Sequence, residues 1–395
     1  MNPQCIYLDN NATTAPLPEV SLAVQTAMQT LWGNPSSIHR VGQEARHQVD
    51  LAREAVAALV HATPAEIIFT SCGTESANLA ILTARKANPD RNVIVTSKIE
   101  HAAVGEFLDV YEDDGLEIIR LDNDGNGVMD MVQLQKLLEE RADEIAVVTL
   151  MWCNNETGVI EPIETACNLC HKYGVLIHSD GTQWVAKMPV DVREGTGVPV
   201  DMLTFAAHKF HGPKGVGALY TRSGLTVAPL VTGGPQERGR RGGTENVPAI
   251  LGFGIAAVEA EKWLQPENIK RMEQLRDNFE LKIMQEHKEA HINSRGAPRA
   301  WTTSSISFPS IKSELMLLML SERGVCASSG SACSSGAFKE SKVIEAIGTP
   351  GDGEWGTVRF SLARTTTLAE LEQAAEALSD VLSTIDEIIT ESVAT

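Results

Sequence analysis

Two stretches decide the fold, VLIHSD at residues 175–180 and AAHKFHGPKG at residues 206–215. The first is a run of strand-forming residues that ends on the carboxylate of Asp180. The second carries Lys209, twenty-nine residues after Asp180, just before a Gly-Pro-Lys-Gly turn at which a helix cannot continue. Strand ends and turns are where functional side chains gather, so this context favours a chemical role for both residues.

Lys209 is a candidate Schiff-base lysine. Pyridoxal phosphate needs an amine, a carboxylate that keeps its pyridine nitrogen protonated, and a cradle for its phosphate. Lys209 and Asp180 are candidates for the first two. A lysine chosen without context is a solvated surface charge in most cases, so the prediction depends on this setting.

Strand-like and helical patterns alternate around these stretches. Continuous apolar strands separated by amphipathic helices predict an α/β fold with a mainly parallel sheet covered on both faces. Ligands of such sheets bind beyond the carboxyl ends of the strands. The strand-like runs are EIIFT (66–70), NVIVT (92–96), IAVVTLMW (145–152) and VLIHSD (175–180).

The length of 395 residues and a hydrophobic fraction of 43% favour two domains. Past about residue 255 the pattern changes to a charged helical stretch, 259–287, and then to short strands. We expect a large domain over residues 16–255. Residues 1–15 and 256–395 are expected to form a smaller α+β domain.

Charge and composition narrow the class of protein. The formal net charge of −19 argues against non-specific binding to nucleic acid or to anionic lipid. No apolar run approaches the roughly 18 residues that span a bilayer, and the first residues do not have the pattern of a signal peptide. Seven scattered cysteines do not suggest a disulfide framework. We expect a cytoplasmic protein with reduced thiols.

Three polar groups follow predicted strands. Gly73 and Thr74 open a helix whose N-terminus can bind phosphate, although such a start is more often a simple cap. Asn155 follows a buried strand and could donate to a cofactor oxygen, or could belong to an ordinary turn. His101 could stack on an aromatic ring and carry protons, or could be structural.

Residues 325–338, VCASSGSACSSGAF, are small and glycine-rich, and predict a mobile loop around Cys333. A thiol on such a loop can attack a bound substrate and carry the product outward, whereas Cys326 fits a packed structural cysteine better. Arg364 ends a predicted strand, where its guanidinium could bind an amino-acid carboxylate through two parallel hydrogen bonds.

Two further motifs are rejected. CNLCH, residues 167–171, matches a haem-attachment pattern and half a zinc site, but no second ligand pair follows it. We expect its cysteines to pack on a crossover helix. Residues 122–133 have the spacing of a calcium loop but end on Gln133, and are expected to form a solvated turn.

Taken together, the motifs closely resemble those of the NifS/IscS-type cysteine desulfurases, which are fold-type I pyridoxal-phosphate enzymes of the class-V aminotransferase family. The resemblance covers nearly the whole chain, and the Cys333 loop separates desulfurases from ordinary class-V aminotransferases. The motifs are YLDNNATT (7–14), GNPSSIHRVGQEAR (33–46), FTSCGTES (69–76), EHAAV (100–104), NNETG (154–158), AAHKFHGPKGVGALY (206–220), ERGRRGGTEN (237–246), SSGSAC (328–333) and RFSLARTTT (359–367).

The resemblance implies a large domain with a seven-stranded sheet and a role for each site residue. Lys209 would be the Schiff-base lysine and Cys333 the residue that accepts sulfur as a persulfide. The resemblance assigns the other cofactor and substrate contacts to Asp180 (pyridine nitrogen), Gln183 and Asn155 (phenolate oxygen), His101 (ring stacking and proton transfer), Gly73, Thr74 and His208 (phosphate), and Arg364 with Asn155 (substrate carboxylate).

The resemblance also implies partners. Thr244 would reach the phosphate of the other subunit, which implies a homodimer with two composite sites. The substrate would be L-cysteine, the product L-alanine, and the sulfur acceptor a protein such as an iron–sulfur scaffold. The rivals are a selenocysteine lyase, a class-V aminotransferase and a non-catalytic scaffold.

The sequence departs from the family pattern at Ala206, Gly181 and Thr182. Family members commonly carry a hydroxyl or thiol side chain where this chain has Ala206, so one phosphate hydrogen bond is missing from the pattern. We expect weaker cofactor retention but not its loss.

Overall fold

A seven-stranded sheet forms the centre of the computed structural model, which describes residues 5–330, 341–348, 351 and 354–393. The strand order is β2-β8-β7-β6-β5-β3-β4, and β8 runs antiparallel to β2 and β7 while the other neighbours run parallel. The strands are β2 (Ile67–Thr70), β3 (Val93–Ser97), β4 (Glu117–Leu121), β5 (Ile145–Met151), β6 (Leu176–Asp180), β7 (Met202–Ala206) and β8 (Gly217–Thr221).

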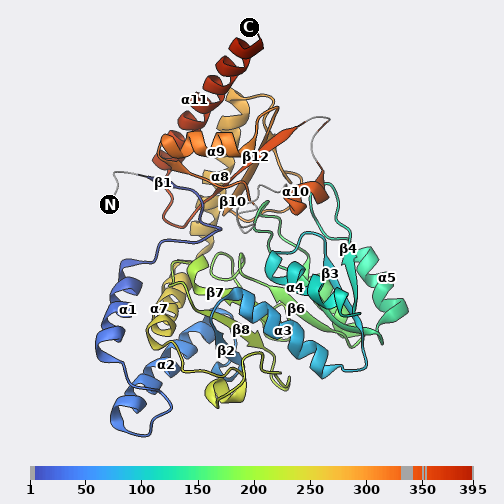
Figure 1. Cartoon of the computed structure of the whole chain (residues 1–395), viewed down its shortest axis with the longest axis vertical. Helices are drawn as coiled ribbons and strands as arrows, with labels where there is room; N and C mark the ends of the chain where they lie inside the picture. The colour runs from blue at the N-terminus through green and yellow to red at the C-terminus, as the bar shows by residue number, and fades with distance from the viewer. Residues whose placement is uncertain (1–4, 331–340, 349–350, 352–353, 394–395) are drawn as a thin grey trace.

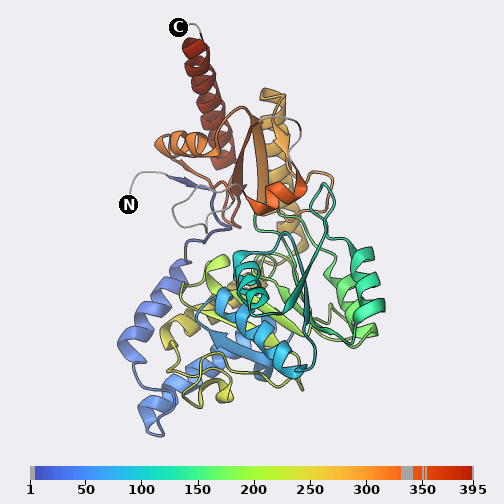
Figure 2. The same cartoon turned by 45° about the vertical axis from the view of Figure 1, so that its right-hand side comes forward.

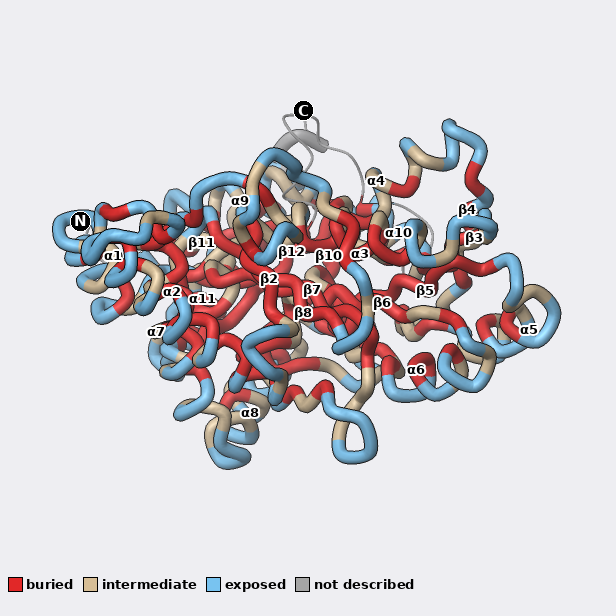
Figure 3. Tube along the Cα trace, turned by 90° about the horizontal axis from the view of Figure 1, so that it is seen from below, coloured by how far each residue is buried: buried red, intermediate tan, exposed pale blue. Residues whose placement is uncertain are grey.

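Helices cover both faces of this sheet (Figures 1 and 3). Side chains alternate along each strand, so Ile67 and Phe69 enter one core while Ile68 enters the other. Helices α3 (Gly73–Ala87) and α4 (Ala102–Asp113) pack on the second face. The first face is covered by α1 (Pro18–Thr30), α2 (Arg40–Leu59), α5 (Met131–Arg141), α6 (Ile163–Lys172) and α7 (Val247–Trp263).

A smaller α+β unit has its own apolar core and lies at the upper end in Figure 1. The central strand β10 (Thr303–Pro309) pairs antiparallel with β9 (His291–Ile292) and with β12 (Trp355–Ser361). A short parallel pair joins β1 (Ile6–Tyr7) to β11 (Val325–Cys326). The helices of this unit are α8 (Pro266–Glu286), α9 (Ser313–Glu322) and α11 (Leu368–Val393), while α10 (Lys342–Ile347) buries Val343 in the core of the large sheet.

The predicted fold class is confirmed, with two local differences. The helical stretch 259–287 is two helices, because Pro266 cannot continue α7 and instead begins α8. Val325 and Cys326, placed in the predicted loop, form β11 because the N-terminal strand offers them a hydrogen-bonding edge. Helix α7 runs through residue 255 and buries Ala256, Ala257 and Ala260 in the core of the large sheet. The domain division at that residue stays a prediction.

The two rejected motifs have ordinary structural environments. Cys167 and Cys170 are buried in the core on α6, which confirms their predicted packing. In the 122–133 segment, Asp124 Oδ1 accepts hydrogen bonds from the backbone N–H groups of Asn126 and Val128, as expected for a turn. Over the part of the chain that the structure describes, no helix combines the length and apolarity needed to cross a bilayer.

The N-terminal segment joins the two units, and Figure 2 shows it passing between them. Leu8 N donates to Cys326 O in the small unit, and Thr14 N donates to His208 O beside the large sheet, both at 2.8 Å. Between these anchors lie Asn11 and Ala12, whose backbone carbonyls face the candidate site.

Candidate active site

The predicted residues converge at the carboxyl edge of the large sheet. Asp180 is the last residue of β6, and its register partners are Met151 on β5 and Thr204 on β7. Lys209 ends a single 3-10 turn, η2 (Ala207–Lys209), that follows β7 directly. The parallel order of β5, β6 and β7 therefore brings these groups to one edge, as the sequence predicts.

The Lys209 amine points to the N-terminal segment. Its Nζ donates to the carbonyl oxygens of Asn11 at 2.7 Å and Ala12 at 3.0 Å. Both carbonyl groups belong to the N-terminal segment that joins the two units of the protein. An amine held at the end of a short turn is suitably placed to react with a carbonyl compound at the sheet edge.

Asp180 is buried at 7% exposure and accepts a hydrogen bond from Thr182 N at 2.9 Å. Below it, His178 lies between two hydroxyl groups, Thr149 Oγ1 at 2.8 Å and Thr204 Oγ1 at 2.9 Å. Burial lowers the pKa of His178 to about 4. This neutral imidazole fixes the strand ends without adding a positive charge that would compete for the Asp180 carboxylate.

His101 caps helix α4. Its Nδ1 accepts a hydrogen bond from Ala103 N at 3.0 Å, which leaves Nε2 as the nitrogen that carries the proton in the neutral ring. The preceding residue, Glu100, is fully buried, and burial raises the pKa of its carboxyl group to about 8. The Glu100 Oε1 atom accepts from Ser97 Oγ and from Met151 N, each at 2.8 Å.

The predicted phosphate cradle lies at the start of α3. Helix α3 begins at Gly73, and a Cβ there would lie 3.4 Å from Thr182 Oγ1 and 3.7 Å from Ala206 Cβ. Thr74 is exposed on the same first turn. The backbone N–H groups of this turn and the helix dipole favour an anion.

Three ionisable residues, Glu75, Arg241 and His208, border the cradle. Glu75 accepts from Ser71 N at 2.8 Å and is paired with Arg241 at 2.9 Å. His208 contacts Thr13 Oγ1 through Nδ1 at 3.1 Å, and burial, followed by the charge of Lys209, lowers the pKa of His208 to about 4. At neutral pH His208 therefore offers a phosphate an uncharged ring.

Gln183 and Asn155 meet the N-terminal segment from two sides. Gln183 Nε2 donates to Asn11 O at 2.9 Å. Asn155 O accepts from Asn11 Nδ2 at 3.0 Å. The Asn11 side chain also donates to Thr303 Oγ1 at 2.8 Å, so the N-terminal segment connects both predicted residues to the small unit.

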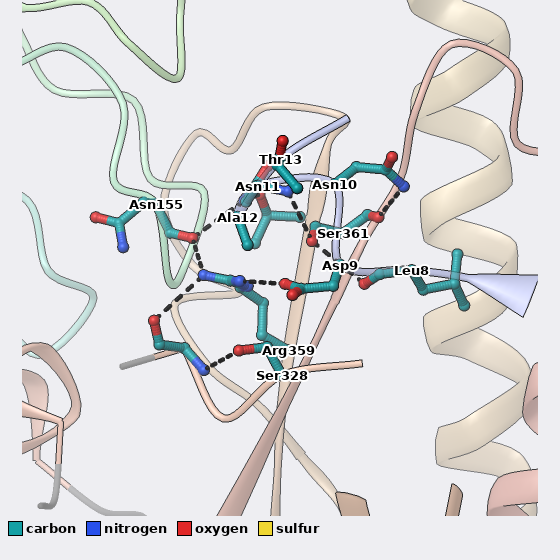
Figure 4. A network of polar contacts seen from close by, with 12 residues as sticks. Leu8, Asp9, Asn10, Asn11, Ala12, Thr13, Asn155, Ser328, Arg359 and Ser361 are labelled. Atoms are coloured by element: carbon teal, nitrogen blue, oxygen red, sulfur yellow. Dashed lines mark hydrogen bonds and ion pairs between the residues drawn. The ribbon is translucent and has the colours of Figure 1, made fainter. Parts of the chain in front are cut away.

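Two arginines approach the site from the small unit. Arg364 lines a small cavity together with Lys209, Thr14 and Trp301, and burial lowers the pKa of its guanidinium. Arg359, which sequence reasoning missed, is 2% exposed and lies beside Asn155 (Figure 4).

The Arg359 guanidinium is held by three partners. Nη2 pairs with Asp9 Oδ1 at 2.6 Å, while Nη1 donates to Asn155 O at 3.0 Å and to Gly330 O at 3.3 Å. Its Nε atom is buried without a hydrogen-bond partner among the described residues. A cation inside the strand-like run TVRFSL was the sequence signal for this residue, since a buried arginine needs partners.

Two predicted residues are not placed in this cluster. Cys333 lies outside the described residues, and the described chain stops before it at Gly330. Thr244 is exposed and lines a separate hollow with Ser71 and Arg241, close to the start of α3. Its expected contact with the phosphate of a second subunit stays a prediction.

The residues present fit pyridoxal phosphate. The sheet edge combines an amine, a carboxylate and an imidazole, contributed by Lys209, Asp180 and His101, with a helix N-terminus able to bind phosphate. A Cβ at Gly73 would be in van der Waals contact with Thr182, Thr204 and Ala206, so the first turn of α3 lies against the carboxyl edge of the sheet. A flat ring with an anionic arm matches this set of groups.

Comparison with known proteins agrees with this fit. Residues 6–374 match the family model described as aminotransferase class-V. The chain is 42% identical over 377 residues to cysteine desulfurase 1 of Trichormus variabilis, covering 95% of this chain and 92% of the relative. A solved NifS-like protein superimposes with a TM-score of 0.87 at 35% identity, covering 96% of this chain and all of the other.

The chain therefore belongs to the class-V aminotransferase family, which is a family of pyridoxal-phosphate enzymes. Within that family it falls in the NifS-like branch. A structure described as SspA in complex with cysteine is also similar, with a TM-score of 0.78 and 30% identity over 91% of this chain and 99% of the other.

Proposed function

We propose that the protein is a pyridoxal-phosphate-dependent cysteine desulfurase that converts L-cysteine to L-alanine and transfers the sulfur to Cys333. The convergence of Lys209 and Asp180 at one sheet edge, within a NifS-like fold, is the observation that carries the proposal. When bound, the cofactor supplies an electron sink for the carbon skeleton of the amino acid.

The residues of the sheet edge hold and orient the reactants. Lys209 would anchor the cofactor and then move a proton at its Nζ atom, while Asp180 would keep the ring nitrogen protonated. His101 would face the ring and carry a proton at Nε2. Gln183 and Asn155 would lie near the phenolate oxygen, and the first turn of α3, with Gly73 and Thr74, would bind the phosphate along with His208.

The substrate carboxylate requires a cation at the opposite side of the site. Arg364 lines the Lys209 cavity, which supports its predicted role. Arg359 is the second candidate, because it lies on the carbonyl of Asn155 and is fixed by Asp9. A guanidinium can bind a carboxylate through two parallel hydrogen bonds.

The sulfur step is a transfer between two thiols. The Cys333 thiolate would form a bond to the sulfur of L-cysteine as the carbon–sulfur bond breaks, which gives a persulfide on the enzyme and releases L-alanine. A free thiol has a pKa near about 8.5, so the site must stabilise the thiolate for the step to proceed at neutral pH. The persulfide would then pass to an acceptor protein, such as an iron–sulfur scaffold, in the cytoplasm.

A homodimer completes the proposal. Large apolar side chains are exposed on α1, at Leu22 and Met28, and between α1 and α2, where Trp32 has 74% and Ile38 94% exposure. Their clustering in one part of the chain supports an interface with a second copy. Thr244, exposed near the start of α3, would contribute to the site of the partner subunit.

Loss of the Cys333 thiol gives the direct test. Incubation with L-cysteine is expected to add roughly 32 Da, one sulfur atom, to the Cys333 peptide by mass spectrometry. Cys333→Ser is expected to abolish alanine formation and the adduct while cofactor stays bound. Cys326→Ser, a change of a cysteine outside the proposed chemistry, is the matched control. Alanine release by Cys333→Ser at the parent rate would show that another group takes the sulfur.

A further inference from the structure

Lys187 is a buried lysine whose ammonium group faces amide oxygens inside the protein. The residue is 5% exposed, and its Nζ donates to Gln183 Oε1 and, at 3.4 Å, to Asn11 Oδ1. Burying an amine is costly unless hydrogen bonds replace its water. The two amide oxygens are what make this position tolerable, and both belong to residues of the candidate site.

The backbone around Lys187 holds this geometry. Ala186 has a φ of 66°, an unfavourable left-handed conformation for a residue with a Cβ. Lys187 O accepts from Trp301 Nε1 at 2.9 Å, and Lys187 N donates to Trp184 O at 3.1 Å. The strained turn therefore directs the lysine side chain back to Gln183, and bonds on both sides maintain it.

The ammonium group of Lys187 determines the orientation of the Gln183 side-chain amide. Lysine offers donors and no acceptor when protonated, so Gln183 must turn its oxygen to Lys187. The Gln183 Nε2 atom is then the donor on the other side, where Asn11 O accepts it at 2.9 Å. Without Lys187, only the Asn11 carbonyl would be left to orient the amide, and the Gln183 oxygen would lose its donor.

The Gln183 donor and the Lys209 amine meet on the same atom. Asn11 O accepts from Gln183 Nε2 at 2.9 Å and from Lys209 Nζ at 2.7 Å. The donor that Lys187 orients is therefore directed at the place where the reactive amine lies. A chain of contacts runs from Lys187 through Gln183 and Asn11 to Lys209.

The charges around Lys187 are mainly positive. Lys209 and Arg359 both oppose its protonation, and only the charged thiolate form of Cys153 would favour it. Burial, followed by Lys209, lowers the pKa of Lys187 to about 7. The positive charge of Lys187, which orients the Gln183 amide, is therefore present below pH 7 and is lost as the pH rises above 7.

We propose that Lys187 is a positioning residue that holds the Gln183 amide with its N–H₂ group toward Lys209 and the adjoining oxygen of the bound cofactor. The proposal rests on the proposed function, since it assigns Gln183 to that cofactor. It adds a residue that would act through Gln183 rather than on the reacting atoms.

The test compares Lys187→Met, Gln183→Ala and the double variant with the parent holoenzyme. Two readouts besides activity are followed: the pH midpoint of the visible absorption band, and the dissociation constant for pyridoxal phosphate from titration of the apo protein. Loss of one oriented hydrogen bond is expected to weaken cofactor binding by about two- to tenfold in Lys187→Met and to shift the midpoint. The double variant should have the same pH midpoint and the same dissociation constant as Gln183→Ala, because Lys187 acts through Gln183. Lys136→Met, on an exposed lysine of α5, controls for loss of charge.

The proposal is overturned if Lys187→Met keeps the parent midpoint and affinity, or if the double variant shows the sum of both effects. Should Lys187→Met not fold, Gln183→Glu decides. Its carboxylate can accept from Lys187 but lacks the donor, so a melting temperature no lower than that of Gln183→Ala, with weak cofactor binding, is expected. A melting temperature of Gln183→Glu below that of Gln183→Ala would contradict the contact between Lys187 and residue 183. A parent protein that binds no cofactor would instead refute the proposed function.

Discussion

At the scale of single residues, two arginines of the small unit are candidates for binding the substrate carboxylate. Arg359 and Arg364 both approach the site, one beside Asn155 and the other beside Lys209. Loss of the pairing with the substrate carboxylate costs about 1.5–3 kcal/mol, which is roughly a 10- to 150-fold fall in kcat/KM.

We expect this loss in one of the variants Arg359→Ala and Arg364→Ala, expressed mainly as a higher KM for L-cysteine. Steady-state kinetics with the two variants and the parent identify the carboxylate partner. Equal KM values in all three enzymes would show that neither arginine binds the substrate.

Glu100 leads to a prediction about pH and stability. Burial raises the pKa of its carboxyl group in the folded state to about 8, above the ordinary value of 4.5, so the folded state holds the proton more tightly than the unfolded state. This contribution is present in full below pH 4.5 and is lost as the pH rises through about 8. Glu100→Gln mimics the protonated acid. It is expected to stabilise the protein by about 2 kcal/mol at pH 8 and little at pH 4.5.

Urea unfolding of Glu100→Gln and the parent at both pH values checks this prediction. A difference of one in pKa between the folded and unfolded states corresponds to about 1.4 kcal/mol of stability. A parent that is already as stable as the variant at pH 8 would mean that Glu100 ionises without penalty.

At the scale of elements, a close contact joins the Asn155 loop to the small unit. Gly158 has a φ of 79°, and a Cβ there would lie 2.8 Å from Thr303 Cβ on β10. Gly158→Ala is therefore expected to destabilise the protein by about 1–3 kcal/mol, through both backbone strain and overlap. Gly105→Ala, at the fourth residue of α4, meets no atom within 4 Å and is expected to stabilise the protein by about 0.5–1 kcal/mol.

Thermal or denaturant unfolding of the Gly158→Ala and Gly105→Ala proteins measures both effects. We expect Gly158→Ala to lower the free energy of unfolding and Gly105→Ala to raise it. Equal stability of the two variants would mean that the Asn155 loop and β10 separate easily, and that the contact between the units does not fix the site.

The elements also show what sequence patterns can and cannot predict. Asp180 and Lys209 were predictable because the end of an apolar strand and the start of a Gly-Pro turn are visible locally. The role of Asn11 was not predictable from local pattern, since its contact to Gln183 joins residues 172 positions apart. Lys187 and Arg359 were missed for the same reason, although a charge inside an apolar stretch is a sign of buried partners.

At the scale of the whole molecule, composite sites predict recovery of activity in mixed dimers. Lys209→Ala removes the amine of its own site, and Thr244→Asp places a carboxylate where the partner's phosphate would bind. Each homodimer is expected to be inactive or strongly impaired. A mixed dimer has one site with an intact Lys209 and an intact Thr244 from the other subunit.

Refolding or co-expression of the two variants followed by a cysteine desulfuration assay measures this recovery. Activity well above the sum of the separate variants is expected. If mixing restores nothing while dimers form, Thr244 acts within its own subunit or has no part in the site.

The central claim is that the amine of Lys209 carries pyridoxal phosphate. Borohydride reduction of the purified holoenzyme, followed by peptide mapping, tests it most directly because reduction makes the link between lysine and cofactor permanent. The cofactor mass is expected on the peptide that contains Lys209 and not on the peptide that contains Lys187, which lines the same cavity. Labelling of Lys187, or of no lysine at all, would contradict the account.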